Sequence, residues 1–370
     1  MTLLFNIVQF NSGTLFYRLS NEEGKAWLLP AKNMRTALAL YQSGSKRGRL
    51  LKRWLPLLHR VTAVCRYLKM EQMQLDLHEP LRSKLQELFQ CTTFEFALYE
   101  GTPSVNQKIT IQISSGRTIL GYCKVTDNAS VAELFHKEHL FLKWLKEKGV
   151  VPIPHVLYCG SDTNSLSLFV QDTRKTIRAT RPHRLTPRHW AFLQELDART
   201  EIPCRFATTD FCKALNRLEC YLESLSAEDA RIVQTALRRV RQHYRQKYVA
   251  FSVYHADFTP WNTYMTEHRV FAFDFEYAAR TCPPYMDACN FILQTAIQEF
   301  KYSAEKTYRY FRMQTKSFPS DIDDPYFLCL CSLLYTLSFY YHLRNGSLDT
   351  THNGYRCCIA LAKILVEQKR

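Results

Sequence analysis

The 370-residue sequence lacks long hydrophobic runs. It contains no stretch of 18 apolar residues, which is the length that predicts a membrane-spanning helix. Its opening residues carry no basic start and are interrupted by Asn6 and Gln9, a pattern that argues against a signal peptide. We therefore expect a cytoplasmic protein.

Paired cysteine motifs are also absent. The thirteen cysteines are odd in number and scattered, with no C-x-x-C pair and no Cys/His set at zinc-binding spacing. Cys329 with Cys331, and Cys357 with Cys358, lie in apolar runs, where cysteine behaves as a small buried hydrophobic residue. The pattern predicts reduced thiols and no structural zinc.

Acidic residues are too few to balance the basic ones, which leaves a net charge of +15. Such an excess predicts an acidic partner: nucleotide phosphates, an anionic membrane surface, an acidic glycan or nucleic acid. The basic residues cluster at 46–60 and 238–247. In the first cluster, apolar residues recur at helical spacing opposite basic ones. That helix either lies on an anionic membrane or packs its apolar stripe on the protein. Neither cluster carries a nucleic-acid-binding motif, so we expect no nucleic-acid partner.

The segment Tyr254–Tyr277 carries the chemistry. A polar stretch holding His255, Asp257 and Asn262 precedes an alternating apolar run that ends on Asp274. This pattern predicts a loop followed by a short strand that delivers a carboxylate. Asp and Asn are common turn formers, but three polar anchors beside an apolar strand are hard to explain by turn chemistry alone.

Phosphoryl transfer requires residues of these types. One carboxylate must orient the attacking hydroxyl, and oxygen ligands must hold the magnesium ion that neutralises the phosphates. Asp257 suits the first task, while Asn262 and Asp274 suit the second. The five-residue step from Asp257 to Asn262 is that of the protein-kinase catalytic loop.

The motifs H-A-D-F-T-P-W-N and F-D-F-E-Y together resemble the paired signature of the aminoglycoside phosphotransferase and choline kinase superfamily. Pro283–Gln294 is similar to the segment that follows in choline and ethanolamine kinases, although Gln294 stands where those kinases tend to carry Glu. The resemblance implies an α+β, bilobal, protein-kinase-like fold, with a small β-rich N-lobe and a helical C-lobe. It also implies that His255, within the catalytic loop, braces that loop.

We divide the chain into an N-terminal extension at 1–90, a nucleotide-binding small lobe at 91–172 and a catalytic, acceptor-binding large lobe at 173–370. The extension is expected to hold a small antiparallel sheet that stands alone or extends the small lobe, with strands at 4–10, 14–19 and 26–29 and helices at 50–70 and 80–89.

In kinase-like folds, a strand lysine holds the nucleotide phosphates and is fixed by a glutamate on the next helix. Lys124 lies on a predicted strand at 118–125, and the predicted helix at 131–148 carries Glu138 about midway, with Glu133 in reserve.

Three further nucleotide contacts are candidates in the loop before the second small-lobe strand. This loop stands where such folds place backbone amides over the phosphates, and it supplies Gly101, Ser104 and Asn106. It lacks the G-x-G-x-x-G spacing, so a plain hairpin turn is the alternative. The fold also implies that Gln171, at the hinge between lobes, offers its backbone to adenine.

These expectations converge on an ATP- and magnesium-dependent phosphotransferase that acts on a hydroxyl of a small molecule. The acceptor stays open between a cationic amino alcohol or aminoglycoside, which Glu276 favours, and an anionic sugar, lipid or glycan precursor, which the charge favours. The alternative is a catalytically inactive kinase-like scaffold or nucleotide-binding protein.

Overall fold

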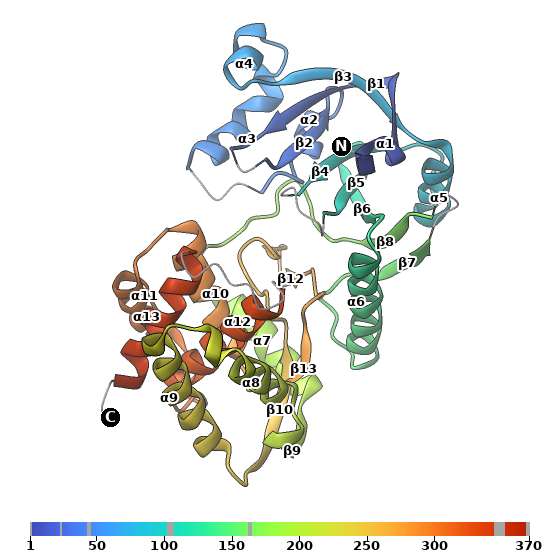
Figure 1. Cartoon of the computed structure of the whole chain (residues 1–370). Coiled ribbons are helices and arrows are strands. Elements are labelled where there is room, and N and C mark those ends of the chain that lie inside the picture. The colour runs from blue at the N-terminus through green and yellow to red at the C-terminus, as the bar shows by residue number, and fades with distance from the viewer. Residues whose placement is uncertain are drawn as a thin grey trace. The chain divides into compact units, whose positions relative to one another are not determined.

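The computed structural model describes residues 2–22, 24–42, 46–101, 107–161, 165–343 and 352–367. The chain divides into two compact units (Figure 1). Unit 1 comprises Met1–Trp144 and Ile153–Thr180, and unit 2 comprises Leu145–Pro152 and Arg181–Arg370. No helix within the described residues is long and apolar enough to cross a membrane.

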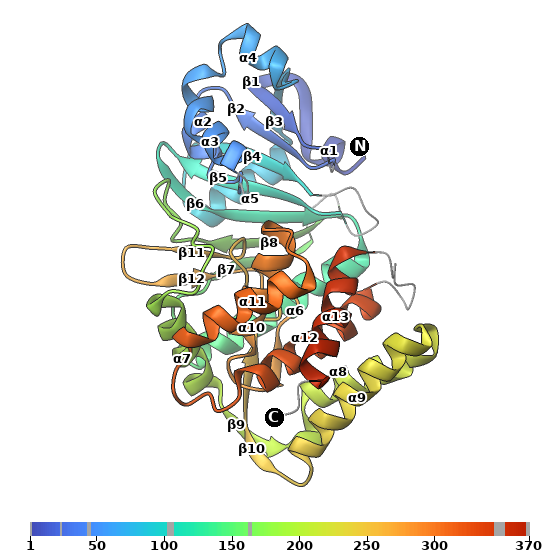
Figure 2. The same cartoon turned by 90° about the vertical axis from the view of Figure 1, so that its left-hand side faces the viewer.

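Unit 1 is built on an antiparallel sheet that has eight strands in the described part of the chain, in the order β3-β1-β2-β4-β5-β6-β8-β7 (Figures 1 and 2). The strands are β1 Val8–Ser20, β2 Ala26–Pro30, β3 Glu71–Leu77, β4 Glu95–Glu100, β5 Ile109–Ser115, β6 Thr118–Thr126, β7 Val156–Ser161 and β8 Ser167–Asp172. The helices of this unit are α1 Thr2–Ile7, α2 Met34–Ala37, α3 Lys46–Leu58, α4 Thr62–Tyr67, α5 Glu79–Phe89 and α6 Ala129–Glu147.

The N-terminal strands extend the sheet of the small lobe. β2 pairs with β4, with Ala26 opposite Glu100. One hydrophobic core contains Leu28 and Leu75 from the first ninety residues together with Ile111 and Val125 from the following segment. Of the two arrangements left open for residues 1–90, the structure has the one in which their strands continue the small-lobe sheet.

The prediction of a strand at 4–10 was wrong for its first half, because Thr2–Ile7 forms helix α1. Leu3, Leu4 and Ile7 are buried on one side of that helix. The break expected around Gly13 is a bulge inside β1. The pairing of β1 with β3 shifts there, and a Cβ at Gly13, whose φ is +79°, would lie 2.7 Å from Asp76.

Helix α6 lies along unit 1 with one buried face. Val131, Phe135, Leu142 and Leu145 are buried at helical spacing, and Glu138 is buried in the same row. This face therefore places a carboxylate among apolar side chains.

Unit 2 is mainly helical. Its helices are α7 Pro187–Thr200, α8 Asp210–Cys220, α9 Ala227–Tyr244, α10 Met286–Gln294, α11 Ala304–Gln314, α12 Pro325–Leu343 and α13 Asn353–Glu367. Short 3-10 turns lie at Phe206–Thr208, Leu222–Ser224 and Thr315–Ser317, and a π-helical turn lies at Thr295–Glu299. The strands are β9 Ile202–Arg205, β10 Tyr248–Tyr254, β11 Thr263–Met265, β12 Val270–Ala272 and β13 Ala279–Cys282, which form the sheets β13-β10-β9 and β11-β12.

Helix α12 is the centre of unit 2. It contacts α8, α9, α10 and α13 (Figure 2), and Leu330, Leu333 and Leu337 on it are fully buried. Cys329 and Cys331 are buried there as the sequence predicted, and so are Cys357 and Cys358 on α13.

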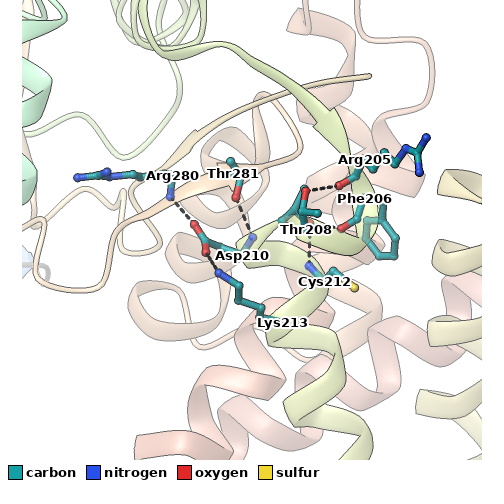
Figure 3. Close-up of polar contacts among 9 residues, drawn as sticks. Arg205, Phe206, Thr208, Asp210, Cys212, Lys213, Arg280 and Thr281 are labelled. Atoms are coloured by element: carbon teal, nitrogen blue, oxygen red, sulfur yellow. Dashed lines mark hydrogen bonds and ion pairs between the residues drawn. The ribbon is translucent and has the colours of Figure 1, made fainter. Parts of the chain in front are cut away.

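A polar network joins α8 to β13 (Figure 3). The Asp210 backbone N–H donates to Thr281 Oγ1 at 2.7 Å, and its carboxylate accepts from the Arg280 backbone N–H at 3.1 Å and from Lys213 Nζ at 3.0 Å. Burial raises the pKa of Asp210, but these hydrogen bonds outweigh burial and hold it below its usual value. Because β13 pairs with β10, the network fixes the sheet from which the polar loop emerges.

Candidate active site

Shortly after β10, the polar loop contains an alanine in an unfavourable backbone conformation. Ala256 has φ +67°, in the left-handed region that residues with a Cβ seldom adopt. Asp287, at the start of α10, holds this turn: its carboxylate accepts the backbone N–H of His255 at 2.8 Å. Strain that is held in place by surrounding contacts is typical of functional loops.

His255 is fully buried and connects the loop to the strand beyond it. Its Nε2–H donates to the Phe273 carbonyl oxygen at 3.0 Å, and its Nδ1 accepts the backbone N–H of Asp257 at 3.3 Å. Both ring nitrogens therefore serve to hold backbone. This is the bracing arrangement that the resemblance implies.

Asp257 and Asn262 are in direct contact. Asn262 Nδ2 donates to Asp257 Oδ2 at 2.7 Å and to the Asp257 carbonyl oxygen at 3.1 Å. Asn262 is buried and Asp257 is half-buried. Because the amide nitrogen of Asn262 faces the carboxylate, its amide oxygen is the atom available to a cation.

Asp274 lies at the same end of the β11-β12 hairpin as Asn262. Thr263 pairs with Ala272, and the Phe273 backbone N–H donates to the Asn262 carbonyl oxygen at 3.1 Å. Asp274 follows directly, with φ +70°. The hairpin thus brings together two residues that are twelve positions apart in the sequence.

Unit 1 contains the second group of candidate residues. Lys124 Nζ lies 2.7 Å from Glu138 Oε2, with Lys124 6% and Glu138 0% exposed, and the Phe169 ring lies 5.1 Å from the ammonium. Glu133 is exposed, so the structure pairs the lysine with Glu138. A paired, buried lysine keeps its position and its charge.

The remaining nucleotide candidates lie on or after strands of the same unit. Gln171 is buried on β8 and pairs with Tyr122 of β6. Gly101 follows β4, and a Cβ there would meet only the Lys108 carbonyl oxygen, at 3.8 Å, so no steric reason requires glycine. Ser104 and Asn106 lie outside the described residues. The nucleotide contacts stay predictions.

Two supporting acids in unit 2 were missed by the sequence interpretation. Besides Asp287, Asp197 on α7 accepts the Tyr285 backbone N–H at 3.1 Å and the Ser252 hydroxyl. Burial raises the pKa of Asp197 to about 7 and that of Asp287 well above its usual value. A single acid inside the apolar run M-D-A-C-N-F-I-L was the available signal for Asp287.

The donor atoms gathered in unit 2 are a half-buried carboxylate, an amide oxygen and a second carboxylate. These are hard oxygen ligands, the kind that magnesium prefers, and no imidazole or thiolate is needed to complete the set. Ala256 and Asp274, at the two ends of the arrangement, both have a left-handed backbone conformation. The arrangement is suited to orienting a hydroxyl beside a cation.

Residues 121–292 match the phosphotransferase enzyme family. No curated protein matches the chain. The family match runs from within β6 to within α10, and this part of the chain carries Lys124, Glu138, Asp257, Asn262 and Asp274. This match supports the class that the sequence predicts, a kinase-type phosphotransferase similar to the aminoglycoside phosphotransferase and choline kinase superfamily.

Solved structures agree on the fold. A thermostable mutant of the aminoglycoside phosphotransferase APH(4)-Ia, in its apo form, is 16% identical, with a TM-score of 0.50 over 77% of this chain and 97% of that chain. Another mutant form of that enzyme, in a ternary complex with AMP-PNP and hygromycin B, is 15% identical, with a TM-score of 0.50 over 78% and 98%. A choline/ethanolamine kinase family protein from Mesorhizobium loti is 15% identical, with a TM-score of 0.49 over 78% and 94%. The protein-kinase-like fold class is confirmed.

Proposed function

We propose that this phosphotransferase moves the terminal phosphoryl group of ATP to a hydroxyl of a small molecule, in a magnesium-dependent reaction. The observation that carries the proposal is the 2.7 Å hydrogen bond from Asn262 Nδ2 to Asp257 Oδ2. It orients the Asp257 carboxylate and leaves the amide oxygen of Asn262 available to a cation. A scaffold protein has no need of that arrangement.

Asp257 would orient the acceptor hydroxyl and accept its proton. Phosphoryl transfer passes through a loose transition state, so positioning and charge neutralisation matter more than the strength of the base. The braces on the loop support such positioning, because His255 and Asp287 leave the backbone around Asp257 little freedom.

Asn262 and Asp274 would hold magnesium, which neutralises charge on the phosphates when it is bound. Their oxygen atoms are chemically suited to this ion. Lys124, kept in place by Glu138, would contact the phosphates directly as a fixed cation. Gln171 and Gly101, with Ser104 and Asn106, remain the proposed contacts for the rest of the nucleotide. The AMP-PNP complex of the related APH(4)-Ia mutant supports a nucleotide as donor.

The acceptor is proposed only as a class. Hygromycin B in the related APH(4)-Ia complex supports a small polyhydroxylated molecule. Glu276 favours a cationic acceptor of this kind, whereas the charge of +15 favours an anionic sugar, lipid or glycan precursor.

The test compares Asp257→Asn and Asp274→Asn with Asp323→Asn, a matched change at an exposed aspartate of unit 2. Release of ADP is measured with a panel of aminoglycosides, amino alcohols and sugars. Thermal unfolding is followed with ATP, in the presence and absence of magnesium. We expect stabilisation by ATP only with magnesium, and a loss of at least about a hundredfold in kcat for Asp257→Asn.

The control variant should keep the activity and the metal-dependent stabilisation of the natural chain. Asp274→Asn should lose the stabilisation that depends on magnesium while unfolding at the same temperature without ligand. Transfer that persists in both site variants would refute the assignments. Stabilisation by nucleotide without transfer to any acceptor would favour the inactive-scaffold alternative.

A further inference from the structure

Unit 1 presents a surface on which exposed apolar and basic side chains are mixed. It is formed by α3, α4 and the link between them, and we call it the α3–α4 surface (Figure 1). Six of the eleven exposed large hydrophobic residues in the described part of the chain fall within 50–67, namely Leu50, Trp54, Leu57, Leu58, Val61 and Tyr67. Such clustering on one short segment marks a site of interaction, because isolated apolar residues would be scattered.

Helix α3 has two apolar faces. Leu55 and His59 are buried and Leu51 is partly buried, and this row, spaced by four residues, attaches the helix to the core of unit 1. The second row holds the exposed residues. Leu57, at 71% exposed, and Leu50, at 59%, belong to it. Of the two alternatives for this helix, packing on the protein therefore holds for the first row. The second row, whose spacing of four, seven and eight residues keeps it on one side of the helix, stays exposed.

The charge around this surface has one sign. Between Gly24 and Met70 the sequence contains eleven Lys and Arg residues and no Asp or Glu. Arg47, Arg49, Arg53 and Arg60 are exposed along α3 and just beyond it. The surface therefore combines apolar side chains with a stretch of sequence whose charges are all positive.

Trp54 belongs to the apolar side chains of this surface and also contacts one of the basic ones. It is 45% exposed, and the Arg53 guanidinium lies over its ring, 5.6 Å from the centroid. Tryptophan prefers the interface of a bilayer, where its ring meets the acyl boundary and its polar edge meets headgroups. Arginine beside it is placed to pair with lipid phosphates.

We propose that the α3–α4 surface binds the interface of an anionic phospholipid bilayer. Leu50, Trp54 and Leu57 enter the boundary between headgroups and acyl chains, and the flanking arginines pair with the phosphates. A basic helix with a separate apolar row is typical of segments that lie in this plane. Nucleic acid is the less suitable partner, since three leucines offer nothing to a sugar-phosphate backbone. The proposal stands independently of phosphoryl transfer.

The test uses the full chain with vesicles of phosphatidylcholine alone or mixed with phosphatidylglycerol. The variant Leu50→Glu/Leu57→Glu is compared with Leu140→Glu/Met313→Glu, which changes two other exposed apolar residues by the same charge. We expect the natural chain and the control to co-sediment with the mixed vesicles, and the surface variant to bind at least about tenfold more weakly. High salt should weaken the binding of the natural chain.

Fluorescence provides a second readout. Binding to mixed vesicles should shift the tryptophan emission to the blue, and Trp54→Phe should remove most of the shift, because Trp54 is the one exposed tryptophan of the five, all of which lie in the described part of the chain. The proposal is overturned if the natural chain ignores anionic vesicles or if the surface variant and its control bind equally. It is also overturned if glycerol phosphate or duplex RNA displaces the vesicles at stoichiometric concentration, since either result assigns the surface to a soluble phosphate ligand.

Discussion

The buried ion pair of unit 1 leads to the sharpest prediction. Lys124 and Glu138 are 2.7 Å apart, and both side chains are almost completely removed from solvent. Removing one member of such a pair leaves the other charge buried without its counterion, which costs about 3–5 kcal/mol. We expect Glu138→Ala and Lys124→Met each to lower the free energy of unfolding of the chain by about this amount.

The double variant Lys124→Met/Glu138→Leu separates stability from function. Its apolar side chains fill the site without an unpaired charge, so its stability should return to within about 1–2 kcal/mol of the natural chain. In a cycle through the single variants Lys124→Met and Glu138→Leu, these costs give a coupling energy of at least about 4 kcal/mol. If Lys124 contacts nucleotide phosphates, the double variant should still bind ATP poorly.

Urea unfolding measures the free energy of unfolding of each variant, and ATP-dependent thermal stabilisation measures its binding of nucleotide. The exposed pair of Lys363 and Glu228, 2.8 Å apart, is the control, and its rupture should destabilise the chain far less than loss of the buried pair. A Glu138→Ala variant as stable as the natural chain would refute the reasoning. So would a double variant that recovers nucleotide binding along with stability.

Three other predictions concern the acids of unit 2. The folded chain holds the Asp197 proton more tightly than the unfolded chain does, since burial raises its pKa from 3.8 to about 7. The free energy of unfolding should therefore fall by up to about 4 kcal/mol as the pH rises through this window. Asp197→Asn should remove that part of the pH dependence. Urea unfolding at several pH values measures this, and a free energy of unfolding that still falls with pH as in the natural chain would contradict the prediction. Asp210→Asn should cost about 1–2 kcal/mol by weakening the link from α8 to β13. Lys213→Ala, which removes only the partly exposed ion pair, should cost less than about 1 kcal/mol. Asp287→Ala should lower kcat under conditions where the variant is still folded, because it frees the backbone N–H of His255 next to Ala256. Activity equal to that of the natural chain would rule out the bracing role.

The elements predicted most accurately from the sequence are helices whose first residues include a capping residue or a proline. The sequence predicts helices at 187–200, 304–314 and 353–367, and α7, α11 and α13 begin and end at those residues. Pro187 follows the N-cap Thr186, and the Ser303 hydroxyl caps α11 by accepting from Lys306. The sequence also predicts a helix at 227–248. That helix ends early, at Tyr244, because the next residues form the turn before β10, which begins at Tyr248.

Tertiary contacts decided what the sequence could not. A short apolar run such as Leu3–Val8 suits a helix or a strand equally well, and packing on the sheet selected the helix. Asp197 and Asp287 act on backbone N–H groups 88 and 32 residues away, and no side-chain pattern marks such donors. The periodicity of α3 revealed an apolar stripe but gave no sign of which row would be covered.

The continuous sheet of unit 1 limits how far the protein can be truncated from its N-terminus. β6 is hydrogen-bonded to β5 on one side, and β5 to β4, while the segment that matches the phosphotransferase family begins only within β6. A fragment trimmed to that segment, or cut at the lobe boundary before β4, would have an unpaired strand edge. It would also expose apolar side chains that are buried in the full sheet, and both features promote aggregation. Recombinant forms intended for crystallisation or for acceptor screening should therefore retain the first ninety residues.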